Sequence, residues 1–99
     1  MTTQPKLEST PGPWQYHLGR GANPRFHVQT TGGYQIASTP EVGHYKPEAE
    51  QREANARLIA ASPDLLEALI EVEQMIHANE LNEGTMSIVR EAISKATGA

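Results

Sequence analysis

Apolar and polar residues alternate in three short stretches of the N-terminal half: Trp14 to Leu18, Arg25 to Thr30 and Tyr34 to Ser38. A period of two is typical of strands with one buried face. The segments between them, GRGANP and TGG, contain the glycines that tight turns favour. We therefore expect a three-stranded antiparallel meander over residues 14–38, with four aromatic side chains in its core: Trp14, Tyr16, Phe26 and Tyr34.

In the C-terminal half the apolar residues recur at the helical period instead. A first helix is expected over residues 48–61. Ser62 then occupies a position typical of a helix N-cap, and Pro63 occupies the first helical position, where its missing N–H costs nothing. The pattern therefore predicts a second helix over residues 63–78.

A third helical stretch follows the polar segment ANELNEG, with Thr85 as its expected cap. Residues 1–13 are rich in Thr, Pro, Ser and Gly, a composition typical of a flexible segment. The predicted fold is α+β. After the flexible segment, a single domain over residues 14–99 consists of a small three-stranded antiparallel meander (14–38) followed by three helices (48–97).

The second predicted helix has more apolar surface than a small sheet covers. Its seam consists of Leu65, Leu69, Val72 and Ile76, spaced four, three and four residues apart. Only 37% of the 99 residues are hydrophobic, so the core of one chain is expected to be thin. We therefore expect the helices to form a homo-oligomer through this seam.

Charge is distributed unevenly along the chain. Residues 1–47 carry four basic and two acidic groups, whereas residues 48–99 carry four basic and ten acidic groups. Such a balance disfavours duplex nucleic acid, although the basic half suits a small anion. The chain has no cysteine, no apolar run of membrane-spanning length and no secretion signal at its start. A cytoplasmic protein without membrane contact is expected.

No pattern of catalytic or metal-ligating residues emerges. The four histidines form no HExxH-like pair, and no serine lies in a GxSxG motif. His17 and His27 fall on the polar faces of neighbouring predicted strands. Solvent-facing cross-strand neighbours are the simpler interpretation of this pair, and a metal site is the alternative. We therefore expect no enzymatic activity, no metal and no cofactor.

The loop GRGANPR, residues 19–25, is a candidate anion site. Its glycines let backbone N–H groups turn toward one point, and Arg20 and Arg25 offer guanidinium donors to a phosphate. The loop matches neither of the common phosphate-binding motifs, so an ordinary solvated hairpin loop is the alternative. A nucleotide base would stack on Tyr45 or on Trp14, although Trp14 is also expected in the core.

Asn55 and Arg57 are two residues apart on the first helix and therefore point about 200° away from each other. Asn55 lies beside Ile59 near the expected buried side, where an amide usually satisfies a backbone group. Arg57 is expected to face outward or to pair with Glu53 one turn earlier. The alternative is that one of the two residues binds a polar ligand, across a subunit boundary.

The segments TPGPW (residues 10–14), YQIAS and EANARLIAASPDLLEAL (residues 53–69) resemble those of a widespread group of small phage and prophage proteins. Members share the Thr-Pro-Gly-Pro-Trp opening and an Asn-Ala-Arg-Leu-Ile-Ala-Ala-x-Pro-x-Leu-Leu-x-Ala-Leu clasp, in which Ser62 stands here where alanine is usual. The resemblance implies a phage accessory gene of the kind that often counters host defence. It assigns no catalytic residue.

These features lead to the hypothesis of a non-enzymatic phage protein that sequesters a small anionic signal, of the cyclic nucleotide or ADP-ribose type, in the host cytoplasm. Its expected ligand-binding residues are Arg20, Arg25, Arg57, Asn55, Trp14 and Tyr45. The alternative is an inhibitor that docks on a host or phage protein through acidic helix residues such as Glu67, Glu71 and Glu73. A purely structural oligomer is a third possibility.

Overall fold

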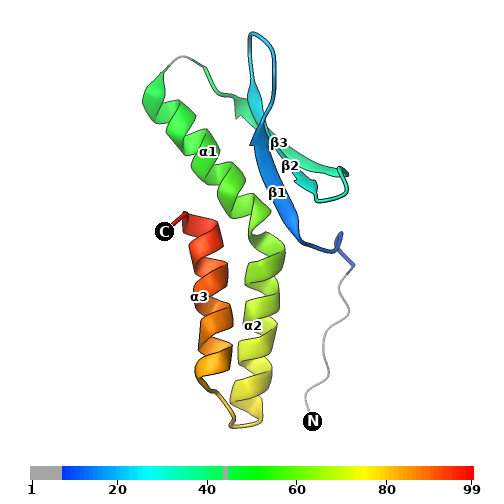
Figure 1. The fold of residues 1–99 in the computed structure, drawn as a ribbon, viewed down its shortest axis with the longest axis vertical. Helices are drawn as coiled ribbons and strands as arrows, with labels where there is room; N and C mark the ends of the chain where they lie inside the picture. Colours follow the sequence, from blue (N-terminus) through cyan, green and yellow to red (C-terminus); the bar gives the residue numbers. More distant parts are fainter. Residues whose placement is uncertain (1–7, 44) are drawn as a thin grey trace.

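The computed structural model describes residues 8–43 and 45–99. Three strands precede three helices, in the order β1 (Trp14–Leu18), β2 (Arg25–Thr30), β3 (Gln35–Glu41), α1 (Lys46–Ala60), α2 (Ser62–His77) and α3 (Glu83–Thr97) (Figure 1). The strands form one antiparallel sheet in the order β1-β2-β3. The predicted α+β fold, a three-stranded meander followed by three helices, is confirmed.

The main core lies between the sheet and α1 (Figure 1). Phe26 and Val28 of β2 pack with Ala56 and Ala60 of α1, and all four are buried. Val28 is the only large side chain among the described residues that is fully buried, so the core is thin. Partly buried residues surround this cluster: Trp14, Tyr16, Ile36, Ala37, Val42 and Ile59.

The third strand differs from its predicted form at both ends. It begins at Gln35, and Tyr34 lies in the preceding turn with 67% of its surface exposed, so the prediction that Tyr34 joins the core is wrong. The pairing of β2 with β3 shifts register between Val28 and Gln29, so the alternation of faces along β3 does not extend to Tyr34, although its carbonyl accepts the Thr30 N–H at 2.9 Å. At its other end β3 continues through Pro40 to Glu41. An edge strand tolerates this proline because its missing N–H has no ladder partner to lose.

Helices α1 and α2 join almost without interruption, and the prediction of a capping Ser62 hydroxyl is wrong. Ala61 keeps helical dihedral angles (φ −83°, ψ −7°), and its N–H donates to the Arg57 carbonyl at 3.0 Å. Ser62 is the first residue of α2, and its hydroxyl donates back to the Leu58 carbonyl at 3.3 Å. Pro63 has no N–H to continue the ladder, so the helices meet at a bend (Figure 1).

Helices α2 and α3 form an antiparallel hairpin that extends away from the sheet (Figure 1). Its buried positions carry small side chains, namely Ala68, Thr85, Ala92 and Ala96. The radius of gyration is 16.1 Å, whereas a compact domain of this length has about 13 Å. The chain is therefore elongated, with extents of 53 × 26 × 16 Å, and much of the hairpin faces solvent.

The third helix begins earlier than expected, and Thr85 is not its cap. Asn82 holds the N-cap position with extended backbone angles (φ −141°, ψ 178°), and its side-chain oxygen accepts the Thr85 N–H at 3.1 Å. Thr85 itself is buried inside the first turn. Asparagine and threonine are both good caps, and here the upstream residue takes the position.

The N-terminal segment meets the start of α2. A Cβ atom placed on Gly12 would lie 2.8 Å from the Cβ of Pro63, so the backbone passes Pro63 at a distance that only glycine permits. The TPGPW and clasp segments therefore touch each other in space. Residues 1–7 lie outside the described residues, and the flexibility expected of residues 1–13 stays a prediction.

Candidate functional site

The six residues expected to bind a ligand are distributed over the sheet, one loop and α1. The structure places Trp14 at the start of β1, Arg20 in the β1–β2 loop, Arg25 at the start of β2, Tyr45 at the N-cap of α1, and Asn55 and Arg57 within α1. Because their surroundings differ, the contacts and exposure of each side chain decide whether it is available to a ligand.

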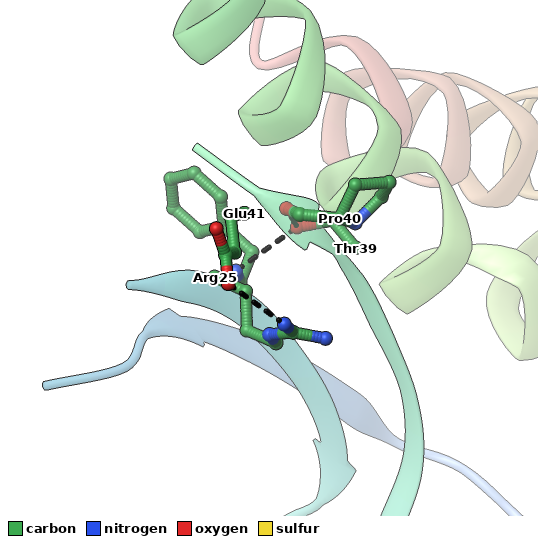
Figure 2. Close-up of polar contacts among 5 residues, drawn as sticks. Arg25, Thr39, Pro40 and Glu41 are labelled. Atoms are coloured by element: carbon green, nitrogen blue, oxygen red, sulfur yellow. Dashed lines mark hydrogen bonds and ion pairs between the residues drawn. The ribbon is translucent and has the colours of Figure 1, made fainter. Parts of the chain in front are cut away.

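Arg25 lies at the β2–β3 edge, where its guanidinium faces Glu41 at 3.5 Å (Figure 2). Beside this pair the Phe26 N–H donates to the Thr39 hydroxyl oxygen at 3.0 Å, and that hydroxyl donates to the Pro40 carbonyl at 2.9 Å. Both charged side chains are about half exposed. An exposed ion pair of this kind contributes about 0–1 kcal/mol to stability. An anion that reached Arg25 would therefore have to displace only a weak contact with Glu41.

Arg57 is largely taken up by structural contacts. It pairs with Glu53 one turn earlier at 3.8 Å, which confirms one of the two expected roles. Its guanidinium also lies against Gly98, where an added Cβ would be 3.0 Å from the Arg57 Cζ. Gly98 is the left-handed C-cap of α3 (φ 75°), so the cation also meets the negative end of that helix dipole.

Asn55 is exposed on α1, so the expectation that it lies near the buried side is wrong. Asn55 and Arg57 still point to opposite sides of α1, but Arg57 is the one that packs inward. Trp14 packs against the core cluster, whereas Tyr45 is 65% exposed. Arg20 is exposed in a loop closed by the bond from the Gly19 N–H to the Arg25 carbonyl at 2.8 Å.

One flank of the α2–α3 hairpin is apolar. The seam expected from the sequence lies here: Leu69 and Ile76 expose 67% and 61% of their surfaces, and both line a shallow depression of 380 Å³ together with Val72, Glu73 and His77. On α3, the 100° step from the buried Ala92 to Ile93 places Ile93, which is 50% exposed, on the side of the hairpin that also carries Leu69 and Ile76. The apolar flank thus runs over both helices.

The opposite flank of the hairpin is charged. A groove of 240 Å³ between α2 and α3 is lined by Asp64, Glu67, Ile88, Glu91, Ala92 and Lys95. Lys95 pairs with Asp64, and both side chains are about one third exposed. Glu67 and Glu91 are left as exposed carboxylates, so this charged flank is acidic.

The outer face of the sheet carries polar groups. His17 and His27 are in register on β1 and β2, with ring centres 5.4 Å apart. The His27 Nδ1 lies 3.3 Å from the Ser38 hydroxyl oxygen. Among the described residues no group of three or more His, Cys, Asp and Glu side chains converges as a metal centre.

Sequence reasoning missed one contact at these surfaces. It did not foresee that Arg57 lies against Gly98, because no local pattern shows which helix end lies beside α1.

Together, fold and surfaces define a small α+β protein in which one helix covers a sheet and a two-sided helical hairpin projects from it. The chain belongs to the family described as Salmonella phage P22 protein Y8K6, whose family model matches residues 1–99. It is therefore a member of a small phage protein family, which confirms the phage part of the resemblance. Neither the curated proteins nor the solved structures contain a match to it. No helix of the described residues combines the length and the apolar character needed to cross a membrane.

Proposed function

We propose that this phage protein is a non-enzymatic binding protein that acts through its α2–α3 hairpin. The apolar flank pairs with a second copy of the chain, and the acidic flank docks on a basic surface of a host or phage protein. The observation that carries this proposal is the exposure of Leu69 and Ile76, 67% and 61%, on a hairpin whose other flank is charged. Burying one such side chain contributes roughly 1.5–3 kcal/mol, so leaving several in water is costly.

A second copy suits the apolar flank for an electrostatic reason. The acidic groups Asp64, Glu67 and Glu91 line the other flank, so two copies can join without bringing these groups together. Glu73 and His77, at the border of the apolar depression, remain at the rim of such a contact. Two hairpins joined in this way would make a four-helix bundle with the twofold symmetry usual for dimers.

Self-association is tested by adding a charge on either flank. Leu69→Asp and Ile76→Asp are expected to reduce the mass measured by light scattering to that of one chain. Ile88→Asp is the matched control, because Ile88 is 43% exposed on the charged flank. A monomeric wild-type protein at high micromolar concentration would overturn the dimer.

Docking through the acidic flank is tested by charge reversal. Wild-type protein used as bait in host lysate is expected to retain one partner in stoichiometric amount, and Glu67→Lys combined with Glu91→Lys is expected to release it. Glu50→Lys reverses an exposed charge on α1 and serves as the control. Equal retention by both variants would remove the acidic flank from the proposal.

A second candidate function is sequestration of an anionic nucleotide-derived signal. Its support is the exposed Arg20 in a glycine-containing loop and the weakly held Arg25 at the base of the same loop. Titration calorimetry against cyclic di- and trinucleotides and cyclic ADP-ribose isomers is expected to give heat with at least one of them. Arg20→Ala should then weaken binding at least tenfold, while Arg90→Ala, on α3, leaves it unchanged. Absence of heat with the whole panel would exclude this candidate.

The two segments that resemble other phage proteins are proposed to act as one structural unit. Gly12 of TPGPW lies against Pro63 of the clasp, so each segment depends on the other. Gly12→Ala would force the two segments apart and is expected to lower the free energy of unfolding by about 1–3 kcal/mol.

The expected site of action is the host cytoplasm, where fractionation of infected cells should find the protein.

A further inference from the structure

The outer face of the sheet holds a pair of imidazoles with no role in the functions proposed above. His17 and His27 face each other across β1 and β2 in register. Strand alternation puts them opposite to Phe26 and Val28, which pack toward α1. The two rings therefore lie on the sheet face that turns away from the core, where an ion from solvent can reach them.

The separation of the rings fits one shared metal ion. Their centres are 5.4 Å apart and their planes are tilted by 36°. Two imidazoles on a tetrahedral zinc, with Zn–N distances of about 2.0–2.1 Å, have ring centres about 5 Å apart. The observed spacing is close to that value, so a metal ion can be bound after rotation of the side chains alone.

Neighbouring residues prepare His27 for this role. Its Nδ1 lies 3.3 Å from the Ser38 hydroxyl oxygen, which also accepts a hydrogen bond from the Gln35 side-chain amide at 3.0 Å. With the Nδ1 proton donated to Ser38, the lone pair of Nε2 is available to a metal. A Cβ on Gly19 would lie 2.8 Å from this Nε2, so the ring packs beside the glycine and any larger residue there would crowd the nitrogen.

We propose that His17 and His27 bind one divalent transition-metal ion of the Zn²⁺, Ni²⁺ and Cu²⁺ class. Imidazole nitrogens suit these ions, whereas Mg²⁺ and Ca²⁺ prefer carboxylate and carbonyl oxygen. Two protein ligands leave coordination positions open to water or to a donor atom of another molecule. The site is separate from both hairpin flanks, so its test does not depend on them.

The test titrates ZnCl₂, and in parallel NiCl₂, into protein without an affinity tag, with calorimetry and NMR of the histidine rings as readouts. The wild-type protein is expected to bind one ion per chain, with the ring signals of His17 and His27 shifting together. His17→Gln and His27→Gln should each weaken binding more than tenfold. His77→Gln, on α2, is the matched control and should leave the affinity unchanged.

A positioning role for Ser38 gives a second, graded readout. Ser38→Ala should keep the stoichiometry but weaken affinity by about tenfold, the usual effect of removing a partner that orients a ligand. Circular dichroism checks that each variant keeps its fold. The proposal is overturned if the wild-type protein binds neither ion at millimolar concentration, or if the double variant His17→Gln, His27→Gln binds as tightly as the wild type.

Discussion

The two halves of this protein bury their apolar residues to different extents. The sheet and α1 enclose their own cluster, in which Val28 and Ala56 are completely buried. The α2–α3 hairpin buries only small residues and leaves Leu69 and Ile76 in solvent. The first half therefore encloses its own core, whereas the second half leaves large apolar side chains exposed, which supports the proposed contact with another surface.

The largest contrast is expected between Phe26→Ala and Leu69→Ala. Phe26 is 8% exposed in the core cluster, so its truncation should cost about 3–5 kcal/mol and unfold much of the protein. Leu69 is 67% exposed, so its truncation should change the unfolding free energy of the single chain by less than about 0.5 kcal/mol. Urea unfolding at low protein concentration measures both. Equal losses would contradict the division into two kinds of region.

Enlarging a residue at the hairpin contact tests how tightly α2 and α3 close. Ala92 is 4% exposed beside the acidic groove, and Ala92→Leu should cost about 1–3 kcal/mol by overpacking. Ala54→Leu, at an exposed position of α1, is the control and should be tolerated. Thermal unfolding of both variants reports the difference. A stable Ala92→Leu protein would mean that the hairpin opens easily.

The cap of α3 provides a smaller effect within the hairpin. Asn82→Ala removes the acceptor of the Thr85 N–H and should cost about 1 kcal/mol. Asn55→Ala changes the same residue type at an exposed helical position and should stay within about 0.5 kcal/mol of the wild type. Hydrogen exchange at the first turn of α3 should rise only in the Asn82 variant.

The smallest effect is expected at the surface of the sheet. Glu41→Gln removes the partner of Arg25 and should cost less than about 1 kcal/mol, with a difference that shrinks as salt is raised. Denaturant unfolding at low and high ionic strength measures it. A loss well above that limit would show that the sheet edge depends on this pair more than its exposure indicates.

Much of this architecture could be predicted because two periods dominate the chain. Alternation identified the strands, and the spacing of Leu65, Leu69 and Val72 identified an apolar helix seam. Alternation alone predicts a buried Tyr34, because it does not reveal a register shift beside a turn. The sequence also predicts a cap at Ser62, because it does not show that Ala61 stays helical.

The candidate site could be predicted only where it depends on local spacing. The cross-strand position of His17 and His27 followed from strand alternation. The contact of Arg57 with Gly98 did not, because it joins residues far apart in the chain. Which face of a helix remains uncovered likewise depends on how many neighbours the tertiary structure supplies. The spacing of apolar residues predicts the exposed seam on α2, but it does not show that Glu67 of α2 and Glu91 of α3 line one groove.

The nearly unbroken passage from α1 to α2 has a mechanical consequence. Ala61 keeps helical angles, and Pro63 removes only one backbone hydrogen bond, so the chain passes from one helix to the next with no loop between them. Because α1 in turn packs on the sheet, a molecule bound to the hairpin would pull on the sheet through this junction rather than through a slack linker.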